Sequence, residues 1–213
     1  MRGALARLAM LVLIAAAIAV LLFPGARAAA LTALGEVMVV SDAPGTPDVV
    51  VVTSESGAAG DLEAGDLYAR GGVRFVLVLK PAPLPIDREL QRRGVRFPDF
   101  ATETLVQLGI PRSTLTMLDA GEGGTTENTR ALAAWAREHR PARVAVVVGP
   151  THARRYRRAL KRVWPEDVAA PAIVPTPYSA FKASDWWESR TTLREGIVEL
   201  QKLTLDLLLH PLG

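Results

Sequence analysis

The residue with the widest chemical repertoire in this sequence is a histidine at the end of an apolar run. His152 follows the run 144–148, and Arg154 and Arg155 come just after it. An imidazole there can act as a general acid or base, and an arginine can hold a phosphate or carboxylate through two N–H groups. The simpler alternative is a histidine at a helix start that only bonds to nearby backbone. The sequence alone is compatible with both interpretations of His152.

A second polar group lies in the segment 121–128, where glycines precede Thr125, Glu127 and Asn128. Glycine lets backbone approach a ligand closely, and Thr125 or Thr126 can cap a helix that begins here. Free N–H groups at such a helix start can hold an anion. Plain capping, with Glu127 favoured by the helix dipole, is the alternative. We expect Glu127 to serve as a second acid or base, and Thr125 and Asn128 to orient the ligand.

The elements that must position these residues alternate between strands and helices. The β-branched run 48–53 is typical of a strand buried on both faces. An alternation of strands and helices implies right-handed crossovers and a mostly parallel sheet covered on both faces, a three-layer α/β sandwich. The predicted strands are 48–53, 73–79, 115–118, 144–148 and 172–174, and the predicted helices are 62–69, 100–108, 126–139, 153–163 and 193–209.

Ligands of parallel sheets bind beyond the carboxyl ends of the strands. Ser54 follows the first predicted strand and Lys80 the second, so both are predicted to bind the ligand together with Thr125, Asn128, Arg154 and Arg155. His152 and Glu127 are the predicted catalytic residues, if the site is catalytic. The sequence therefore predicts one polar site at this edge of the sheet.

Two helices carry charge patterns. The cations of the helix 153–163 all lie opposite an apolar arc that includes Tyr156, so we predict that most form a solvated face, which anionic lipid could attract. In the last helix, the spacing of Lys202 and Asp206 predicts a surface ion pair. At least one of Trp186 and Trp187 is expected to pack in the core or at its rim.

The N-terminal segment has the layout of an export signal. Arg2 and Arg7 precede the apolar run 8–23, Pro24 interrupts it, and the small-x-small pattern 26–28 follows. We therefore divide the chain into residues 1–34, a signal peptide or single transmembrane anchor with the start of a linker, and residues 35–213, one α/β domain. The early arginines predict that the domain lies outside the cytoplasm. It is then anchored to the cell membrane by a single span, or it is secreted or periplasmic if the N-terminal segment is cleaved. The alternative is a buried helix that starts a globular protein.

Composition excludes several classes. The 213 residues contain no cysteine and three scattered histidines, so we predict no thiol chemistry and no metal site. The net charge is +3 and aromatic stacking motifs are absent, which argues against a nucleic-acid partner. The sequence lacks the Gly-x-Ser-x-Gly motif that would support a serine hydrolase. We predict no cofactor.

The order of the motifs resembles the YdcF/SanA/ElyC-like family over residues 48–208. The resemblance rests on Thr-x-Glu-Asn at 125–128, His-x-x-Arg at 152–155, the tryptophan pair at 186–187 and Glu-x-x-Lys at 199–202. It implies a Rossmann-like sheet, a single membrane anchor and a role in cell-envelope integrity, with a polyprenyl-phosphate or peptidoglycan precursor as ligand. A second branch of the family implies nucleotide-type ligands, including S-adenosylmethionine.

The chain also departs from the family pattern. The family has a glycine pair after the first strand, where this chain has residues 54–57. It has Ser-Gly-Gly after the second strand, where this chain has residues 80–82, and a Thr-Ser pair where this chain has Val148 and Gly149.

Three hypotheses about function therefore stay open. The site binds, and in one version hydrolyses, a small anionic or phosphorylated ligand; or the protein is a non-catalytic module that engages other envelope proteins; or it binds a nucleotide or S-adenosylmethionine.

Overall fold

Four consecutive valines form β1 (Val49–Val52), the middle strand of the sheet, and all four are buried. The computed structural model describes residues 7, 10–12, 18, 22–80, 82–121 and 124–211. Its other strands are β2 (Phe75–Lys80), β3 (Leu115–Asp119), β4 (Val144–Val148) and β5 (Ala172–Pro175). All pairings are parallel, in the order β3-β2-β1-β4-β5. The predicted α/β class with a parallel sheet is confirmed.

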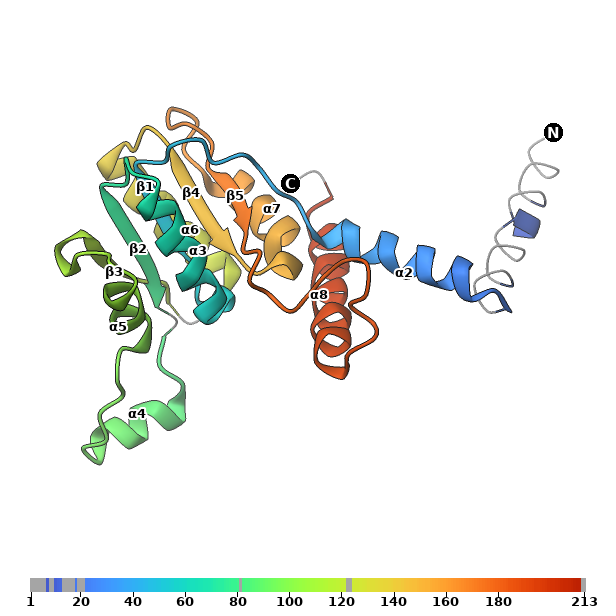
Figure 1. Cartoon of the computed structure of the whole chain (residues 1–213), viewed down its shortest axis with the longest axis horizontal. Coiled ribbons are helices and arrows are strands. Elements are labelled where there is room, and N and C mark those ends of the chain that lie inside the picture. Colours follow the sequence, from blue (N-terminus) through green and yellow to red (C-terminus); the bar gives the residue numbers. More distant parts are fainter. Residues whose placement is uncertain are drawn as a thin grey trace.

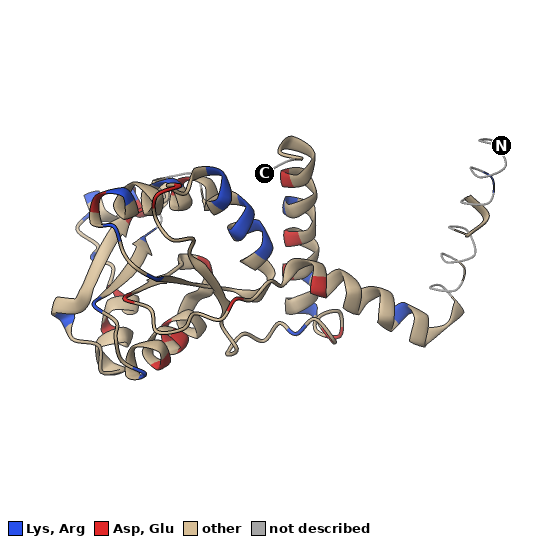
Figure 2. Ribbon diagram, turned by 90° about the horizontal axis from the view of Figure 1, so that it is seen from above, with Lys and Arg blue, Asp and Glu red and all other residues tan. Residues whose placement is uncertain are grey.

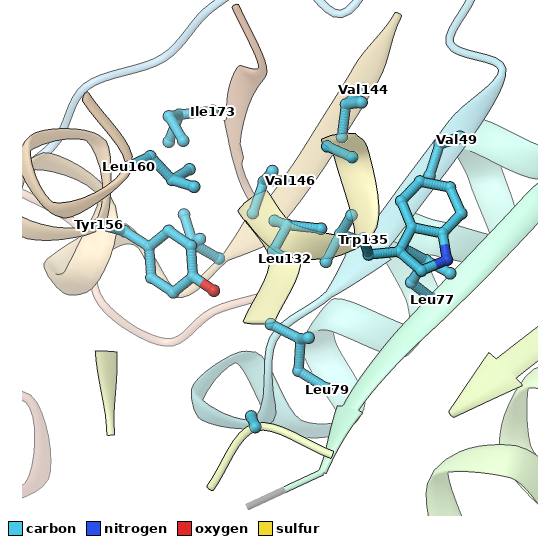
Figure 3. Close-up of a cluster of buried hydrophobic side chains, with 14 of the residues drawn as sticks. Val49, Leu77, Leu79, Leu132, Trp135, Val144, Val146, Tyr156, Leu160 and Ile173 are labelled. Carbon is cyan, nitrogen blue, oxygen red and sulfur yellow. The ribbon is translucent and has the colours of Figure 1, made fainter. Parts of the chain in front are cut away.

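Helices cover both faces of this sheet, as Figure 1 shows. Alternate side chains of a strand point to opposite faces. Val50 and Val52 therefore pack with α3 (Gly57–Ala69) and α5 (Phe100–Gln107), through residues such as Leu67 and Leu105. Val49 and Val51 pack on the other face with α6 (Thr125–His139) and α7 (Ala153–Val163). Figure 3 shows this second cluster, in which Leu132, Tyr156 and Leu160 meet the sheet.

The direction in which strands are added to the sheet reverses between β1 and β4. The chain runs outward from β1 to β3 and then returns to β4 on the other side of β1. Ligands of open parallel sheets commonly bind at such a switch point, beyond the carboxyl ends of the strands. Two short 3₁₀ turns stand there, η1 (Ser54–Ser56) after β1 and η3 (Pro150–His152) after β4. The fold thus brings the segments around Glu55 and His152 together.

Two helices beyond the sheet pack around one tryptophan. Trp186 is buried, its Nε1 donates to the Leu31 carbonyl of α2 (Pro24–Met38), and its ring lies against Gly196 of α8 (Arg190–Leu209). The prediction that one of the tryptophans packs in a core is confirmed. A side chain at Gly196 would meet the ring, so this glycine is needed for the close approach.

Helix α2 corrects the predicted linker. Pro24, expected to break the apolar run, stands in the first turn of α2, where its missing N–H does no harm. The helix runs on to Met38, so the end of the segment 1–34, where a linker was predicted to start, is helical. The small-x-small pattern at 26–28 lies inside α2. Most of the predicted apolar helix 8–23 lies outside the described residues. Within the part of the chain that the structure describes, no helix is both long and apolar enough to cross a membrane.

One helix starts earlier than predicted, and a further helix, after β2, was not among the predicted elements. Helix α3 starts at Gly57, five residues before the predicted start, directly after a turn in which Gly57 has a φ of 52°. The charged segment after β2 forms α4 (Pro85–Arg92), which projects from the body of the molecule (Figure 1). No residue of α4 is buried. A further 3₁₀ turn, η2 (Arg112–Thr114), leads into β3.

Candidate functional site

Arg155 is the centre of a polar cluster at the carboxyl edge of the sheet. Its guanidinium donates to Glu199 Oε2 from Nε at 3.0 Å and from Nη2 at 2.8 Å. Its Nη1 donates to Thr125 Oγ1 at 2.5 Å. One side chain thus joins α7, α8 and the start of α6. Lys202 Nζ donates to the second oxygen of Glu199 at 2.6 Å, so this carboxylate, 2 % exposed, holds two cations.

His152 lies against the same pair. Its Nδ1 is 3.2 Å from Arg155 Nη2 and 3.3 Å from Glu199 Oε2. Burial is the largest influence and, with the positive charges of Arg155 and Lys202, outweighs the carboxylates of Glu199 and Glu55, so the pKa of His152 lies below its usual value. The imidazole is therefore neutral near pH 7 and can accept a proton or a hydrogen bond.

The carboxyl end of β1 adds a second carboxylate. Asn128 Nδ2 of α6 donates to Glu55 Oε1 at 3.4 Å, and Ser54 Oγ donates to Glu55 Oε2 at 3.5 Å. The negative charge of Glu55 acts on both His152 and Tyr156. A Cβ added at Gly149 would stand 3.2 Å from His152 Cδ2 and 3.7 Å from the Glu55 carbonyl oxygen. Glycine at 149 thus leaves room for the imidazole beside η1.

Tyr156 carries a buried hydroxyl without a partner. The side chain is 1 % exposed, and its oxygen makes no hydrogen bond with any described residue. Burial, followed by the negative charge of Glu55, raises the pKa of Tyr156 well above its usual value. Figure 3 shows the ring between α7 and the sheet, with the hydroxyl oxygen at its inner end. A buried hydroxyl without a hydrogen bond is costly, so a further polar group that bonded to it would stabilise this position.

A cavity of about 210 Å³ opens where α6 begins. Thr125 and Thr126 line it on one side, and Arg155, Arg162 and Lys202 on the other. Gly124 occupies the cap position of α6, and no described side chain caps the first turn. The expected capping by Thr125 or Thr126 is therefore wrong, because the Thr125 hydroxyl is engaged by Arg155.

The charges around this cavity do not cancel. Arg155, Arg158, Arg162 and Lys202 contribute four positive charges, and among the described residues their carboxylate partners are Glu199 and Asp206. Burial raises the pKa of Asp206, but hydrogen bonds from Arg158 and Arg162 outweigh this and lower it. Both carboxylates are therefore ionised at neutral pH. An excess of positive charge beside a helix start that no described side chain caps suits an anion.

The predicted solvated face of α7 is wrong for most of its cations. Arg158 and Arg162 pair with Asp206 of α8 at 2.6 and 2.8 Å, and Arg157 pairs with Asp42 at 2.5 Å. In Figure 2 the blue residues of α7 lie beside the C-terminal helix with its red residues. The helical wheel showed which side was basic, but α8 covers that side. The predicted pair of Lys202 and Asp206 is also replaced, since Lys202 binds Glu199.

The structure divides the predicted site residues into three groups. Thr125, His152 and Arg155 meet in the cluster, and Asn128 joins them through Glu55. Ser54 and Lys80 line a neighbouring cavity instead. Glu127 faces Arg130 at 3.6 Å on α6, and Arg154 donates to the Val37 carbonyl of α2. Of the expected loop 121–128, residues 122 and 123 lie outside the described part.

Several members of the cluster escaped prediction as site residues. Glu199 contributed only to the resemblance, and Lys202 to the resemblance and to a predicted surface pair with Asp206. Glu55 is one of several polar residues after the first strand, and Tyr156 belongs to an apolar arc. The spacing of Glu199 and Lys202 on one helix face was the available signal. Within the described residues, no group of three or more histidine, aspartate or glutamate side chains is placed to hold a metal ion.

Comparisons of the chain with protein-family models, with curated proteins and with solved structures found no match. The site therefore has to be interpreted from its own geometry.

Proposed function

We propose that the Arg155 cluster binds a small anionic ligand, a phosphate ester above all. The observation that supports this most is the excess of positive charge around a cavity at the start of α6, where no described side chain caps the helix. Arginine and lysine side chains and free backbone N–H groups are the groups that hold phosphates in proteins. The cavity of about 210 Å³ has room for the phosphoryl group and a small part of its substituent.

Within the cluster, each side chain has a role that follows from its contacts. Arg155 and Lys202 supply the positive charge, and Glu199 holds them in place until a ligand competes for their N–H groups. His152, neutral near pH 7, accepts a hydrogen bond from the ligand or a proton from a water molecule. In the hydrolytic version of the proposal His152 is the general base. The binding version needs only the charges.

The wider setting of this proposal comes from the N-terminal segment and from the motif resemblance. We propose an exported or membrane-anchored protein of the YdcF/SanA/ElyC-like family that acts in cell-envelope biogenesis. A reporter enzyme fused after residue 213 that is active only outside the cytoplasm would support this placement. Activity only inside the cytoplasm would contradict it.

The binding test is the thermal unfolding of the full chain with phenyl phosphate, geranyl phosphate, AMP and S-adenosylmethionine. A ligand that binds the folded state raises the unfolding temperature. We expect a rise with at least one phosphate ester, and dissociation constants about tenfold larger in Arg155→Lys and Lys202→Gln. Arg112→Gln, in an exposed pair far from the cluster, is the matched control. No rise with any phosphate ester, or equal rises in all variants, would contradict the proposal. A rise with S-adenosylmethionine alone would favour the nucleotide-type ligand.

A partner-binding role is the second candidate, and one observation favours it. Leu84 and Ile86 of the α4 segment and Phe100 after it are at least 59 % exposed. Apolar side chains gathered on a projecting segment often mark a protein contact. Two results would support this role over ligand binding: a crosslink from residue 86 to another envelope protein in membranes, and an unchanged envelope phenotype in the His152→Ala variant.

A further inference from the structure

A second cavity, of about 560 Å³, lies on the other side of η1 from the Arg155 cluster. It is bounded by the carboxyl ends of β1 and β2 and by the starts of α3 and α5. Val52, Val78, Leu79 and Phe100 give it apolar walls. The volume lies within the range of sites that enclose small molecules. None of the cluster residues around Arg155 lines this cavity.

One wall of the cavity holds a carboxylate without a partner. Asp61 of α3 is 5 % exposed and lines the cavity. Its carboxyl group makes no hydrogen bond or ion pair with any residue that the structure describes. Burial alone raises the pKa of Asp61 to about 6, so the group is mostly ionised at neutral pH. A buried charge without a partner is unfavourable, and a ligand that supplied the partner would relieve this cost.

The other charged residues of the cavity do not balance Asp61. Lys80 Nζ, at the end of β2, forms an ion pair with Asp99 Oδ2 at 2.7 Å, just before α5 begins. Burial raises the pKa of Asp99, but hydrogen bonds from Lys80 and Thr102 outweigh it and lower the pKa below its usual value. Two carboxylates thus face one ammonium group. The cavity is negative as a whole, which disfavours an anion and favours a cation.

We propose that this cavity binds a small molecule with an apolar body and one ammonium group, held by the carboxylate of Asp61. The apolar walls take the body of the ligand, and Asp61 gives the ammonium group a charge-assisted hydrogen bond. Thr53, Ser54 and Thr104 add hydroxyl groups to the lining, and the Thr53 hydroxyl donates to the Val147 carbonyl oxygen at 3.0 Å. The site is independent of the anion site proposed at Arg155.

The test is calorimetric titration of the full chain with benzylamine, with benzyl alcohol and benzoate as the neutral and anionic matches. We expect benzylamine to bind most tightly at about pH 8 and about tenfold more weakly at about pH 5, where Asp61 is mostly protonated. Benzoate is expected not to bind. Equal affinities for the amine and the alcohol, or no binding of the amine, would overturn the proposal.

Variants distinguish the effect of the Asp61 carboxylate on amine binding from that of any buried carboxylate. Asp61→Asn keeps the shape of the side chain and is expected to remove the preference for the amine together with its pH dependence. Glu63→Gln changes another buried carboxylate of α3, also with a raised pKa, that does not line the cavity, and is expected to leave binding unchanged. Ala58→Trp at the exposed rim is expected to block binding. Amine binding that survives in both Asp61→Asn and Ala58→Trp would place the ligand elsewhere.

Discussion

Two buried carboxylates, one on either side of the end of β1, have opposite electrostatic environments. Glu199 is 2 % exposed and Asp61 is 5 % exposed, so burial is nearly the same. Burial raises the pKa of Glu199, but His152, Lys202 and Arg155 outweigh it and lower the pKa below 4.5. Asp61 has no such partners, and its pKa rises to about 6. The difference shows that partners, and not depth alone, decide whether the pKa of a buried carboxylate lies below or above its usual value.

The same contrast distinguishes the two cavities. Around Arg155 every charge already has a protein partner, so an anion must compete with Glu199 and gains from the excess of cations. Around Asp61 the protein leaves the charge unpaired, and a cation would meet no competitor. The first region is held together by its charges, whereas the second is destabilised by one.

Glu199→Gln is expected to destabilise the fold by about 3 kcal/mol at neutral pH, because it leaves the Arg155 guanidinium, whose side chain is only 15 % exposed, without its anion. The pKa of Glu199 is lowered in the folded state, so its contribution is present above pH 4.5 and lost as pH falls through the folded value. Urea unfolding of both proteins at neutral and acidic pH measures the difference. A loss that stays constant down to the most acidic pH would contradict the assigned ion pair.

Asp61→Asn is expected to stabilise the fold, on the order of 2 kcal/mol at about pH 8. The folded pKa of Asp61 is raised from 3.8 to about 6, so stability is highest below pH 3.8 and is lost as pH rises through 6. The variant removes this loss, and its advantage disappears in acid. The same urea series measures it. A destabilised variant at about pH 8 would show that Asp61 has a favourable partner.

Tyr156→Phe is expected to leave stability unchanged or to raise it by up to about 1 kcal/mol, because the deleted hydroxyl has no partner among the described residues. Thermal unfolding measures this change. Tyr178→Phe is the comparison variant, because the Tyr178 hydroxyl does have a partner and donates to Asp66 at 2.5 Å on the surface. A clear loss of stability in Tyr156→Phe would reveal a bound group at the hydroxyl.

Glu103→Gln, in the exposed pair with Arg112, is expected to change stability by less than about 0.5 kcal/mol. The ions of this pair are more than half exposed, so solvent screens their attraction. Unfolding at low and high salt measures the effect. A loss comparable to that of Glu199→Gln would undermine the comparison, because it would show that burial adds nothing to an ion pair here.

Much of the sheet could be predicted from the sequence because its signals are local. Val49 to Val52 and Val144 to Val148 are continuous apolar runs, and all five predicted strands are present. His152 and Arg155 could be placed for the same reason, since each follows a buried strand. The boundaries of α2 and α3 were missed where Pro24 and the glycines near Gly57 resemble breaks.

The partners in the site could not be predicted because they depend on contacts between distant segments. Glu199 is 44 residues from Arg155, and Asp206 is 48 residues from Arg158. A helical wheel shows that α7 has a basic side, but it does not show which helix packs there. Asp61 was missed because the helix was predicted to begin at residue 62. Its lack of a partner is visible only in the folded chain.

The most direct test of the anion site is to follow residue-specific NMR signals of the full chain during a titration with phenyl phosphate. We predict saturable shifts of the Thr125 and Thr126 amide signals and of the Arg155 Nε–H signal, all with one dissociation constant. These groups line the cavity at the start of α6. The absence of saturable shifts at these three groups, or saturable shifts confined to other parts of the molecule, would contradict the proposed site.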